Sequence, residues 1–360
     1  MNLEKTKNIK LNVMPKINGK NASLSEAITK IRHLITESND IHVNGLGCDL
    51  RGIDKILKFS EKNYTSVDHM DGDNISSFYN HFQRFGGSIC SFGEVSKRSD
   101  LIIFVGDNDN LFKHFCKKYI FNSKRELKTS LLNVISTKKK LNFKHNHFKI
   151  KKNKYESELM NLVQNFRLYK KNKQLNKKDK FYSLIKRMAV SKYGVVAFQF
   201  DNENYFLNQK IVEFNKLMSF EMKFSLLPIG GENNSAGAIQ SSLWKTGYPN
   251  RYKFTENGPE YNPINFSANK LKKKIELQIF ISCFDKNPKL ELFKKNILIG
   301  NPNTFKNHRF DVFIPVSTPG IDQTGLVLRS DGVCTVKLDK YIDSKYKSVD
   351  EIFKMIDENK

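Results

Sequence analysis

Hydrophobic and polar positions along the chain follow periods that predict helices separated by short apolar strands. A Ser-x-x-Glu pattern, Ser23 to Glu26, predicts the start of a helix with one apolar face. A second helix is predicted over 74–85, where Ile, Phe and Tyr recur at helical spacing. Continuous apolar runs at 41–44 and 101–105 predict buried strands, and the latter ends in a Gly-Asp-Asn turn.

The same order of helix and strand returns after a lysine-rich stretch. An amphipathic helix is predicted over 204–220, and strands are predicted at 194–200, 223–228 and 277–288. Parallel sheets bury strands on both faces, so continuous apolar runs are typical of them. Two helix–strand series with matching strand ends therefore predict an α/β fold of two similar, doubly wound, mostly parallel halves.

This order of elements sets the expected domain organisation. A C-terminal hairpin is predicted because Asp331-Gly332 lies between two apolar runs. We expect a first α/β half (20–137) and then a lysine-rich connection (138–180) with one helix at 155–169. A second α/β half (181–300) follows, and a C-terminal segment (301–360) returns onto the fold.

The segment 242–263 concentrates rigid and bulky residues, including the single Trp of the chain. This composition predicts an irregular segment that forms neither helix nor strand. Long loops in compact domains are usually functional or lie at an interface, although a loop that only covers a sheet edge is the simpler alternative. We expect its aromatic residues to anchor it to the fold or to a partner and its prolines to fix its course: Trp244, Tyr248, Tyr261, Pro249 and Pro263.

Composition narrows the class of protein. The chain has 360 residues, of which 39% are hydrophobic, and this indicates a folded protein with an ample core. No apolar run approaches the ~18 residues of a membrane span, and residues 1–15 lack the apolar core of a secretory signal. The five Cys are widely spaced without a Cys-x-x-Cys pair, which favours the cytoplasm and disfavours disulfides, zinc and iron–sulfur clusters.

The net charge of +24 allows two interpretations. A polyanion such as nucleic acid could be the partner, or the lysines could reflect a Lys-rich composition. Nucleic-acid grooves usually combine Arg with interleaved aromatic residues. Because much of the excess lies in lysine clusters at 144–154, 170–180 and 270–274, solvated surface is favoured and nucleic-acid binding is the less favoured alternative.

Candidate sites follow the predicted strand ends, where open α/β sheets bind ligands. The loops are 45–49, 106–110, 230–237 and 282–288. The first reads Gly-Leu-Gly-Cys-Asp, which is not the dinucleotide-binding pattern, so plain turn chemistry is expected there.

Isolated titratable residues give weaker signals. Cys48 could be a reactive thiol, but a buried small residue is expected. His145 and His147 could share a metal, yet they lack a neighbouring carboxylate or Cys and are expected to face solvent. The acidic run 68–73 lacks the spacing of a calcium loop and is expected to form a turn.

Four stretches, in this order, resemble the B subunit of formylmethanofuran dehydrogenase. They are GLGCD (45–49), SFGEVSKRSDLIIFVGDN (91–108), the run from NNSAGA through TGYP and PEYNP to FSA (233–268), and IPVSTPGIDQTGLVLRSDGV (314–333). The resemblance covers about residues 20–340, with 138–180 unmatched. It implies a molybdopterin-oxidoreductase-like fold, and its motifs supply the candidate cofactor-binding or interface residues: Asn108, Asn233, Asn234, Trp244, Tyr248, Tyr261, Asn262 and Asp331.

The chain differs from the redox members of this family in its cysteines. Those members have an iron–sulfur box of closely spaced Cys and a metal-binding Cys or selenocysteine, whereas this sequence has no Cys before Cys48. Met70 stands roughly where the metal thiolate belongs, and a thioether is a poor substitute for it. The resemblance is therefore closer to the metal-free B-type subunit of the bacterial formyltransferase/hydrolase complex, and a molybdenum or tungsten oxidoreductase is the alternative.

The resemblance also implies partners and a carrier. In such a complex, formyl transfer between tetrahydromethanopterin and a methanofuran-type carrier, and hydrolysis to formate, occur on formyltransferase-like and amidohydrolase-like subunits. This chain would be a docking subunit, with no catalytic residue, metal, molybdopterin or iron–sulfur cluster expected on it. Clustered lysines could hold the glutamate-rich tail of the carrier.

Overall fold

The structure is a computed structural model that describes residues 10–121, 132–137, 145–172, 174, 176–199, 205–229, 231–304 and 309–358. The chain forms two compact units, here called unit 1 (Met1–Ser76 with Gly231–Lys360) and unit 2 (Ser77–Gly230). Unit 1 therefore contains both ends of the chain, and unit 2 is one continuous insertion into it. None of the described helices is long and apolar enough to cross a membrane.

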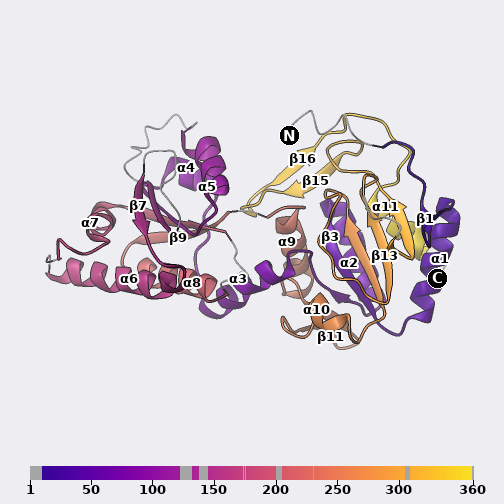
Figure 1. Ribbon diagram of the computed structural model, residues 1–360, viewed down its shortest axis with the longest axis horizontal. Coiled ribbons are helices and arrows are strands. Elements are labelled where there is room, and N and C mark those ends of the chain that lie inside the picture. The colour runs from indigo at the N-terminus through magenta and orange to yellow at the C-terminus, as the bar shows by residue number, and fades with distance from the viewer. Residues whose placement is uncertain are drawn as a thin grey trace. The chain divides into compact units, whose positions relative to one another are not determined.

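Unit 1 is built on a nine-stranded sheet with a parallel centre and antiparallel edges (Figure 1). The strand order is β11-β10-β4-β3-β12-β13-β14-β1-β2, in which β4 through β14 run parallel. The strands are β1 (Lys16–Ile17), β2 (Lys20–Asn21), β3 (Ile41–Gly47), β4 (Ser66–Val67), β10 (Tyr252–Thr255), β11 (Gly258–Tyr261), β12 (Leu277–Ser282), β13 (Lys295–Gly300) and β14 (Val312–Pro315).

Helices cover one face of this sheet. Side chains alternate along β12, so that Ile279 and Ile281 pack under the helices while Phe280 packs on the opposite face with Leu298 and Phe313. A short helix, α10 (Ala268–Leu271), and irregular segments cover that opposite face. The covering helices are α1 (Leu24–Glu37), α2 (Leu50–Lys62), α9 (Ser235–Thr246) and α11 (Val349–Asp357).

The predicted capping box fixes the start of α1. The Ser23 Oγ accepts a hydrogen bond from the Glu26 backbone N–H (3.2 Å), and the Glu26 carboxylate accepts one from the Ser23 N–H (2.7 Å). The same pair of contacts opens α11 at Ser348 and Glu351. Both caps satisfy backbone donors that the first helical turn leaves free.

Unit 2 is built on a five-stranded, fully parallel sheet in the order β7-β6-β5-β8-β9. Helices cover both faces, so neighbouring residues such as Ile103 and Phe104 are both buried, which explains the continuous apolar run in the sequence. The strands are β5 (Leu101–Val105), β6 (Leu132–Ser136), β7 (Asn146–Lys149), β8 (Tyr193–Phe198) and β9 (Lys223–Pro228).

The helices of unit 2 fall into two groups by the core they enter. On one face lie α6 (Tyr155–Asn172), α7 (Tyr182–Val190) and α8 (Tyr205–Ser219), together with α3 (Gly72–Phe85), whose first turn belongs to unit 1. On the other lie α4 (Phe92–Lys97), α5 (Asp109–Phe115) and the π-helix η2 (Cys116–Phe121). A 3-10 turn, η4 (Lys152–Lys154), precedes α6.

The structure confirms the two predicted α/β parts with mostly parallel sheets and the predicted C-terminal hairpin. The hairpin pairs β15 (Gly325–Leu328) with β16 (Thr335–Leu338) on either side of Asp331-Gly332. Only unit 2 carries substantial helices on both faces of its sheet. Unit 1 departs from the doubly wound expectation because the short α10 and loops replace a second helical layer.

The two units divide the chain differently from the expected boundaries at 137/138, 180/181 and 300/301. The physical reason is strand pairing: β3 lies between β4 and β12, with Ile41 opposite Leu277, so early and late segments complete one sheet. The described part of the lysine-rich stretch 138–180 supplies β7 and α6 to the core of unit 2. Residues 138–144 lie outside the described residues.

The expectation that 242–263 forms neither helix nor strand is wrong. Helix α9 runs to Thr246, and β10 and β11 form an antiparallel hairpin in which Thr255 pairs with Gly258. Pro259 is tolerated because β11 is the edge of the sheet, where a missing N–H disrupts no further pairing. Pro249 and Pro263 lie just outside the regular elements.

Candidate functional site

The switch point of unit 1 lies between β3 and β12, where open α/β sheets bind ligands beyond the strand ends. The two strands approach closely there, since the Cys283 N–H donates to the Gly47 carbonyl oxygen at 2.7 Å. Gly45 has a φ of +92°, and a Cβ at this position would lie 2.4 Å from the Ile281 carbonyl oxygen. Only glycine fits this path, because other residues would clash with the neighbouring strand.

Side chains of the chain itself lie at this switch point. A Cβ on Gly47 would lie 2.7 Å from the Met70 Cε, so the methionine packs directly on the strand end. The Asn233 Nδ2 donates to the Met70 Sδ at 3.0 Å. Asn234 joins three segments, because its Nδ2 donates to the Cys48 carbonyl (2.9 Å) and its Oδ1 accepts from the Leu328 N–H (2.9 Å).

Backbone conformation explains why two asparagines stand here. Asn233 and Asn234 have φ angles of 54° and 60°, in the left-handed region that Asn adopts more readily than most residues. Asn234 directly precedes α9, so the turn sets the direction in which that helix leaves the switch point. The sequence motif at 233–234 therefore has a structural reason.

Met70 belongs to an apolar cluster. It packs against the cluster that contains Phe280, Leu298 and Phe313, on the sheet face opposite the helices. Its sulfur already accepts the Asn233 hydrogen bond. Its surroundings are therefore those of a packing residue.

Two thiols end the strands that flank the switch point. Cys48 and Cys283 are both fully buried. Burial raises the pKa of each thiol well above its usual value, and the proximity of Cys283 raises the pKa of Cys48 further. Both thiols are therefore protonated at neutral pH, whereas nucleophilic attack and metal binding need the thiolate.

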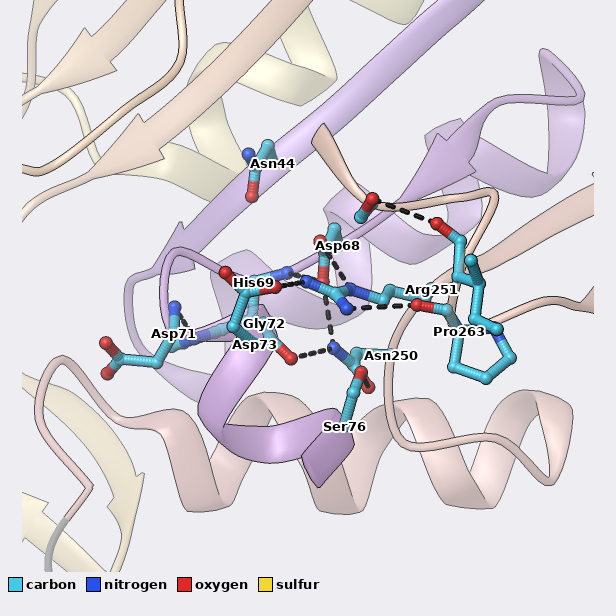
Figure 2. A network of polar contacts seen from close by, with 12 residues as sticks. Asn44, Asp68, His69, Asp71, Gly72, Asp73, Ser76, Asn250, Arg251 and Pro263 are labelled. Atoms are coloured by element: carbon cyan, nitrogen blue, oxygen red, sulfur yellow. Dashed lines mark hydrogen bonds and ion pairs between the residues drawn. The ribbon is translucent and has the colours of Figure 1, made fainter. Parts of the chain in front are cut away.

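A buried ion-pair network lies beside the switch point (Figure 2). The Arg251 Nε donates to the Asp68 carboxylate at 3.1 Å, its Nη2 donates to the Asp73 carboxylate, and its Nη1 donates to the Pro263 carbonyl at 2.9 Å. The Arg251 side chain is 9% exposed and that of Asp68 only 3%. Arg251 also has a φ of 54°, so a strained residue holds this position.

Asn250 extends the network to helix α3. Its Nδ2 donates to the Asp68 Oδ1 (2.8 Å) and to the Gly72 carbonyl (3.2 Å), and its Oδ1 accepts from the Ser76 hydroxyl (3.2 Å). Burial raises the pKa of Asp68, while the nearby Arg251 and the hydrogen bonds from His69 and Asn250 oppose that rise. The network, here called the Arg251 clamp, therefore ties the segment around 250 to the loop 68–73 and the start of α3.

His69 and Asp71 point away from this clamp. The His69 Nδ1 accepts from the Asp71 backbone N–H (3.0 Å), and burial lowers the His69 pKa to about 3, so the ring is neutral with its proton on Nε2. That Nε2 has no hydrogen-bond partner among the described residues. The Asp71 carboxylate points away from Arg251 in Figure 2, and burial, together with Glu232, raises its pKa. No group of three or more metal-ligating side chains was found within the described ranges.

The aromatic candidates of 242–263 play different roles. Tyr248 and Tyr261 stack with ring centroids 4.7 Å apart and an interplanar angle of 4°, and Tyr248 packs on the core of unit 1. Trp244 is 74% exposed on α9, so it does not fill the core. Asn262 shapes a turn, because its Oδ1 accepts from the Asn265 N–H at 2.9 Å.

The remaining candidates lie elsewhere. Asn108 belongs to unit 2, where its Oδ1 caps α5 by accepting from the Leu111 N–H (3.0 Å) and its Nδ2 donates to Gln199. Asp331 is buried and accepts two hydrogen bonds from the Arg329 guanidinium (2.7 and 2.6 Å), which stabilises the turn of the C-terminal hairpin. Of the candidates, the structure thus brings Asn233 and Asn234 together at the switch point.

Sequence reasoning missed the clamp and misjudged two histidines. The sequence did offer two signals for the clamp, since Arg251 is the single Arg of 242–263 and the run 68–73 is acidic. Nothing in the sequence, however, indicates that residues so far apart along the chain form an ion pair. The expectation that His145 faces solvent is wrong, because the ring is buried in unit 2. His147 is half-buried, and its Nε2 lies 2.8 Å from the Ser136 hydroxyl.

Comparison with known proteins supports the resemblance that the motifs indicate. No protein-family model matches the chain. The B subunit of the tungsten-containing formylmethanofuran dehydrogenase 2 of Methanocaldococcus jannaschii is 24% identical over 292 residues, 72% of this chain and 65% of that protein. The family resemblance is confirmed. The protein of the same name from Methanococcus maripaludis is 26% identical over 155 residues, 40% of this chain and 36% of that protein.

The chain therefore spans less than two thirds of the length of these two dehydrogenase relatives. A solved structure confirms the fold over nearly the whole chain. It is the formyltransferase/hydrolase complex (FhcABCD) from Methylorubrum extorquens in complex with methylofuran, with a TM-score of 0.81, 16% identity, and coverage of 95% of this chain and 97% of that one.

The described residues do not fit the tungsten centre that the dehydrogenase relatives carry in their name. Met70, which the motif resemblance places roughly where the thiolate belongs, offers a thioether that already accepts a hydrogen bond from Asn233. The buried thiols of Cys48 and Cys283 have raised pKa values and are poor anionic donors. High-valent metals of this kind prefer thiolate ligands, and this donor set does not offer one at the switch point.

Proposed function

We propose that this chain is a non-redox docking subunit of a formyltransferase/hydrolase complex in tetrahydromethanopterin-linked one-carbon oxidation. Formyl transfer and hydrolysis to formate, through a methanofuran-type carrier, take place on formyltransferase-like and amidohydrolase-like partner subunits in the cytoplasm. The similarity to the B subunit of formylmethanofuran dehydrogenase and the fold shared with a chain of the methylofuran-bound complex support this proposal.

The observation that carries the proposal is the set of side-chain contacts at the switch point. Ligand sites of open α/β sheets need room beyond the strand ends. Here Met70 packs on Gly47, and the side chains of Asn233 and Asn234 hydrogen-bond to neighbouring segments at the same place. A switch point at which a thioether and amide side chains of the same chain contact one another is better suited to presenting a surface than to redox chemistry.

Trp244 is the best candidate for that surface. It is a rigid aromatic residue, 74% exposed, and it stands on α9, whose start is fixed by Asn234. Its neighbour Lys245 is held by an ion pair with Glu61 (2.6 Å). Exposed Trp residues on rigid elements are typical binding hot spots, because they bury a large area at little entropic cost.

The proposal is tested by purifying the tagged chain from its native host. We expect formyltransferase-like and amidohydrolase-like subunits to co-purify. Trp244→Ala should lower their recovery by about tenfold or more, as truncation of an aromatic hot spot typically does. Phe220→Ala is the matched control, because Phe220 is 73% exposed in unit 2. Both variants should melt at the temperature of the parent.

Two results would contradict the proposal. A chain that purifies alone from its host is not a docking subunit. A chain that carries stoichiometric tungsten or molybdenum and reduces a viologen dye with its substrate is the oxidoreductase alternative instead. Equal loss of partners in Trp244→Ala and Phe220→Ala would leave docking intact but remove Trp244 from it.

A further inference from the structure

A lysine-lined pocket opens at one corner of unit 2. Its volume is about 630 Å³, within the range of small-molecule sites. Its wall comes from the end of β7, the turn η4, the first turns of α6 and the residues before α7. The lining includes four lysines and one acidic residue: Lys149, Lys151, Lys154, Lys180 and Glu158.

Three of these lysines are not neutralised by the described part of the chain. Lys180 forms an ion pair with Glu158. Lys149, Lys151 and Lys154 have no ion pair with any described residue. The lining therefore carries a net charge of +3, from four lysines against one glutamate. The positive charges around the pocket repel one another, and a bound anion would reduce that repulsion.

The pocket lies where the parallel strand β7 ends and an 18-residue helix, α6, begins. The first turn of this helix carries Glu156 and Glu158, which already complement the helix dipole. The attraction for an anion therefore comes from the lysines of the lining. The described lining residues include no aromatic ring, whereas proteins that hold nucleic-acid strands stack bases on such rings.

We propose that this pocket binds a small ligand with two or more oxyanion groups, either phosphates or carboxylates. The volume leaves room for a chain of such groups, and the separate lysines contact successive charges. The Ser157 hydroxyl at the wall donates to the Lys154 carbonyl at 3.2 Å. This site lies within unit 2 and does not depend on the docking role proposed for the chain.

The test uses the full chain and isothermal titration at low salt, about 50 mM NaCl, where screening is weak. Inorganic tripolyphosphate and tri-glutamate are titrated separately, and their relative affinities distinguish phosphate from carboxylate. Binding should weaken when the NaCl concentration is raised. The triple variant Lys149→Gln, Lys151→Gln, Lys154→Gln should lower affinity for the preferred anion about tenfold, because each exposed charge pair contributes roughly twofold to threefold.

Two further variants keep the test decisive. Glu158→Gln removes the acidic residue of the wall and should raise the affinity for the anion roughly twofold. A folding defect would lower that affinity instead. A matched triple variant removes three exposed lysines of unit 1 and should leave affinity unchanged: Lys270→Gln, Lys273→Gln and Lys274→Gln.

Clear outcomes would overturn the proposal. Equal losses in the two triple variants would show attraction to the net charge of +24 and no site. Failure of both anions to bind the parent chain at millimolar concentration would also refute it. A random-sequence RNA oligonucleotide that binds more tightly than either anion, with the same lysine dependence, would replace it by a nucleic-acid site.

Discussion

The Arg251 clamp allows a quantitative prediction of stability. In Arg251→Met, the Asp68 carboxylate, 3% exposed, loses its cationic partner but keeps hydrogen bonds from the His69 N–H and the Asn250 side chain, both at 2.8 Å. Removing one partner of a buried ion pair costs about 3–5 kcal/mol. Because two donors remain, we expect a loss near the lower end, about 3 kcal/mol of unfolding free energy, or roughly a 100-fold rise in the unfolded fraction.

Urea unfolding followed by far-ultraviolet circular dichroism gives the change in unfolding free energy. Hydrogen exchange of peptides from unit 1 assigns that change to the correct unit, since two units need not unfold together. Lys294→Met is the matched control, because its ion pair with Glu276 is exposed at both ends (70% and 54%) and exposed pairs contribute little to stability.

A double variant tests the mechanism. Asp68→Leu with Arg251→Met removes both buried charges, so it should cost less than the sum of the two single changes. Equal stability losses in Arg251→Met and Lys294→Met would refute the reasoning that burial makes this pair expensive to break. A double variant that costs more than the sum would refute it as well.

Three further predictions concern unit 1. Burial lowers the pKa of His42 and of His69 to about 3, so between that value and the usual pKa of about 6.5 only the unfolded chain takes up their protons. The unfolding free energy should therefore fall by about 1.4 kcal/mol per histidine between pH 7.5 and pH 5.5, which urea unfolding at both pH values measures. Gly45→Ala should leave little folded protein by circular dichroism, because its Cβ would meet the Ile281 carbonyl, whereas unchanged stability would contradict the close approach. Tyr252→Phe should cost about 1 kcal/mol in urea unfolding, because its buried hydroxyl donates to the Ser242 hydroxyl at 2.9 Å.

Local sequence signals predicted local structure well. The pattern from Ser23 to Glu26 became the capping box of α1, and the apolar run 101–105 became β5. In both cases the cause lies within a few neighbouring residues. The hairpin of 252–261 had a local signal too, the turn pair Asn257-Gly258, whereas the nearby prolines indicated an irregular segment.

Long-range pairing set the limit of prediction. The register of β3 against β12 places Ile41 opposite Leu277, and no local period encodes that choice. The clamp depends on another long-range pairing, that of β4 with β10, which places Tyr252 opposite Val67. Arg251 precedes β10 and Asp68 follows β4, so this pairing brings the two side chains together. The motif resemblance identified the right segments but could not show that Met70 and Asn233 meet at the switch point.

The insertion of unit 2 into unit 1 imposes an order of folding during translation. Strand β4 ends at Val67, and β12, the central partner of β3, begins at Leu277, so about 210 residues (277 minus 67) separate their synthesis. At about 5–20 residues per second the ribosome needs roughly 10–40 s for that interval. All of Ser77–Gly230 emerges in the meantime. Nascent chains halted near residue 270, just before β12 is made, should therefore carry a protease-resistant unit 2 and an unprotected N-terminal segment whose β3 still lacks its parallel neighbour β12.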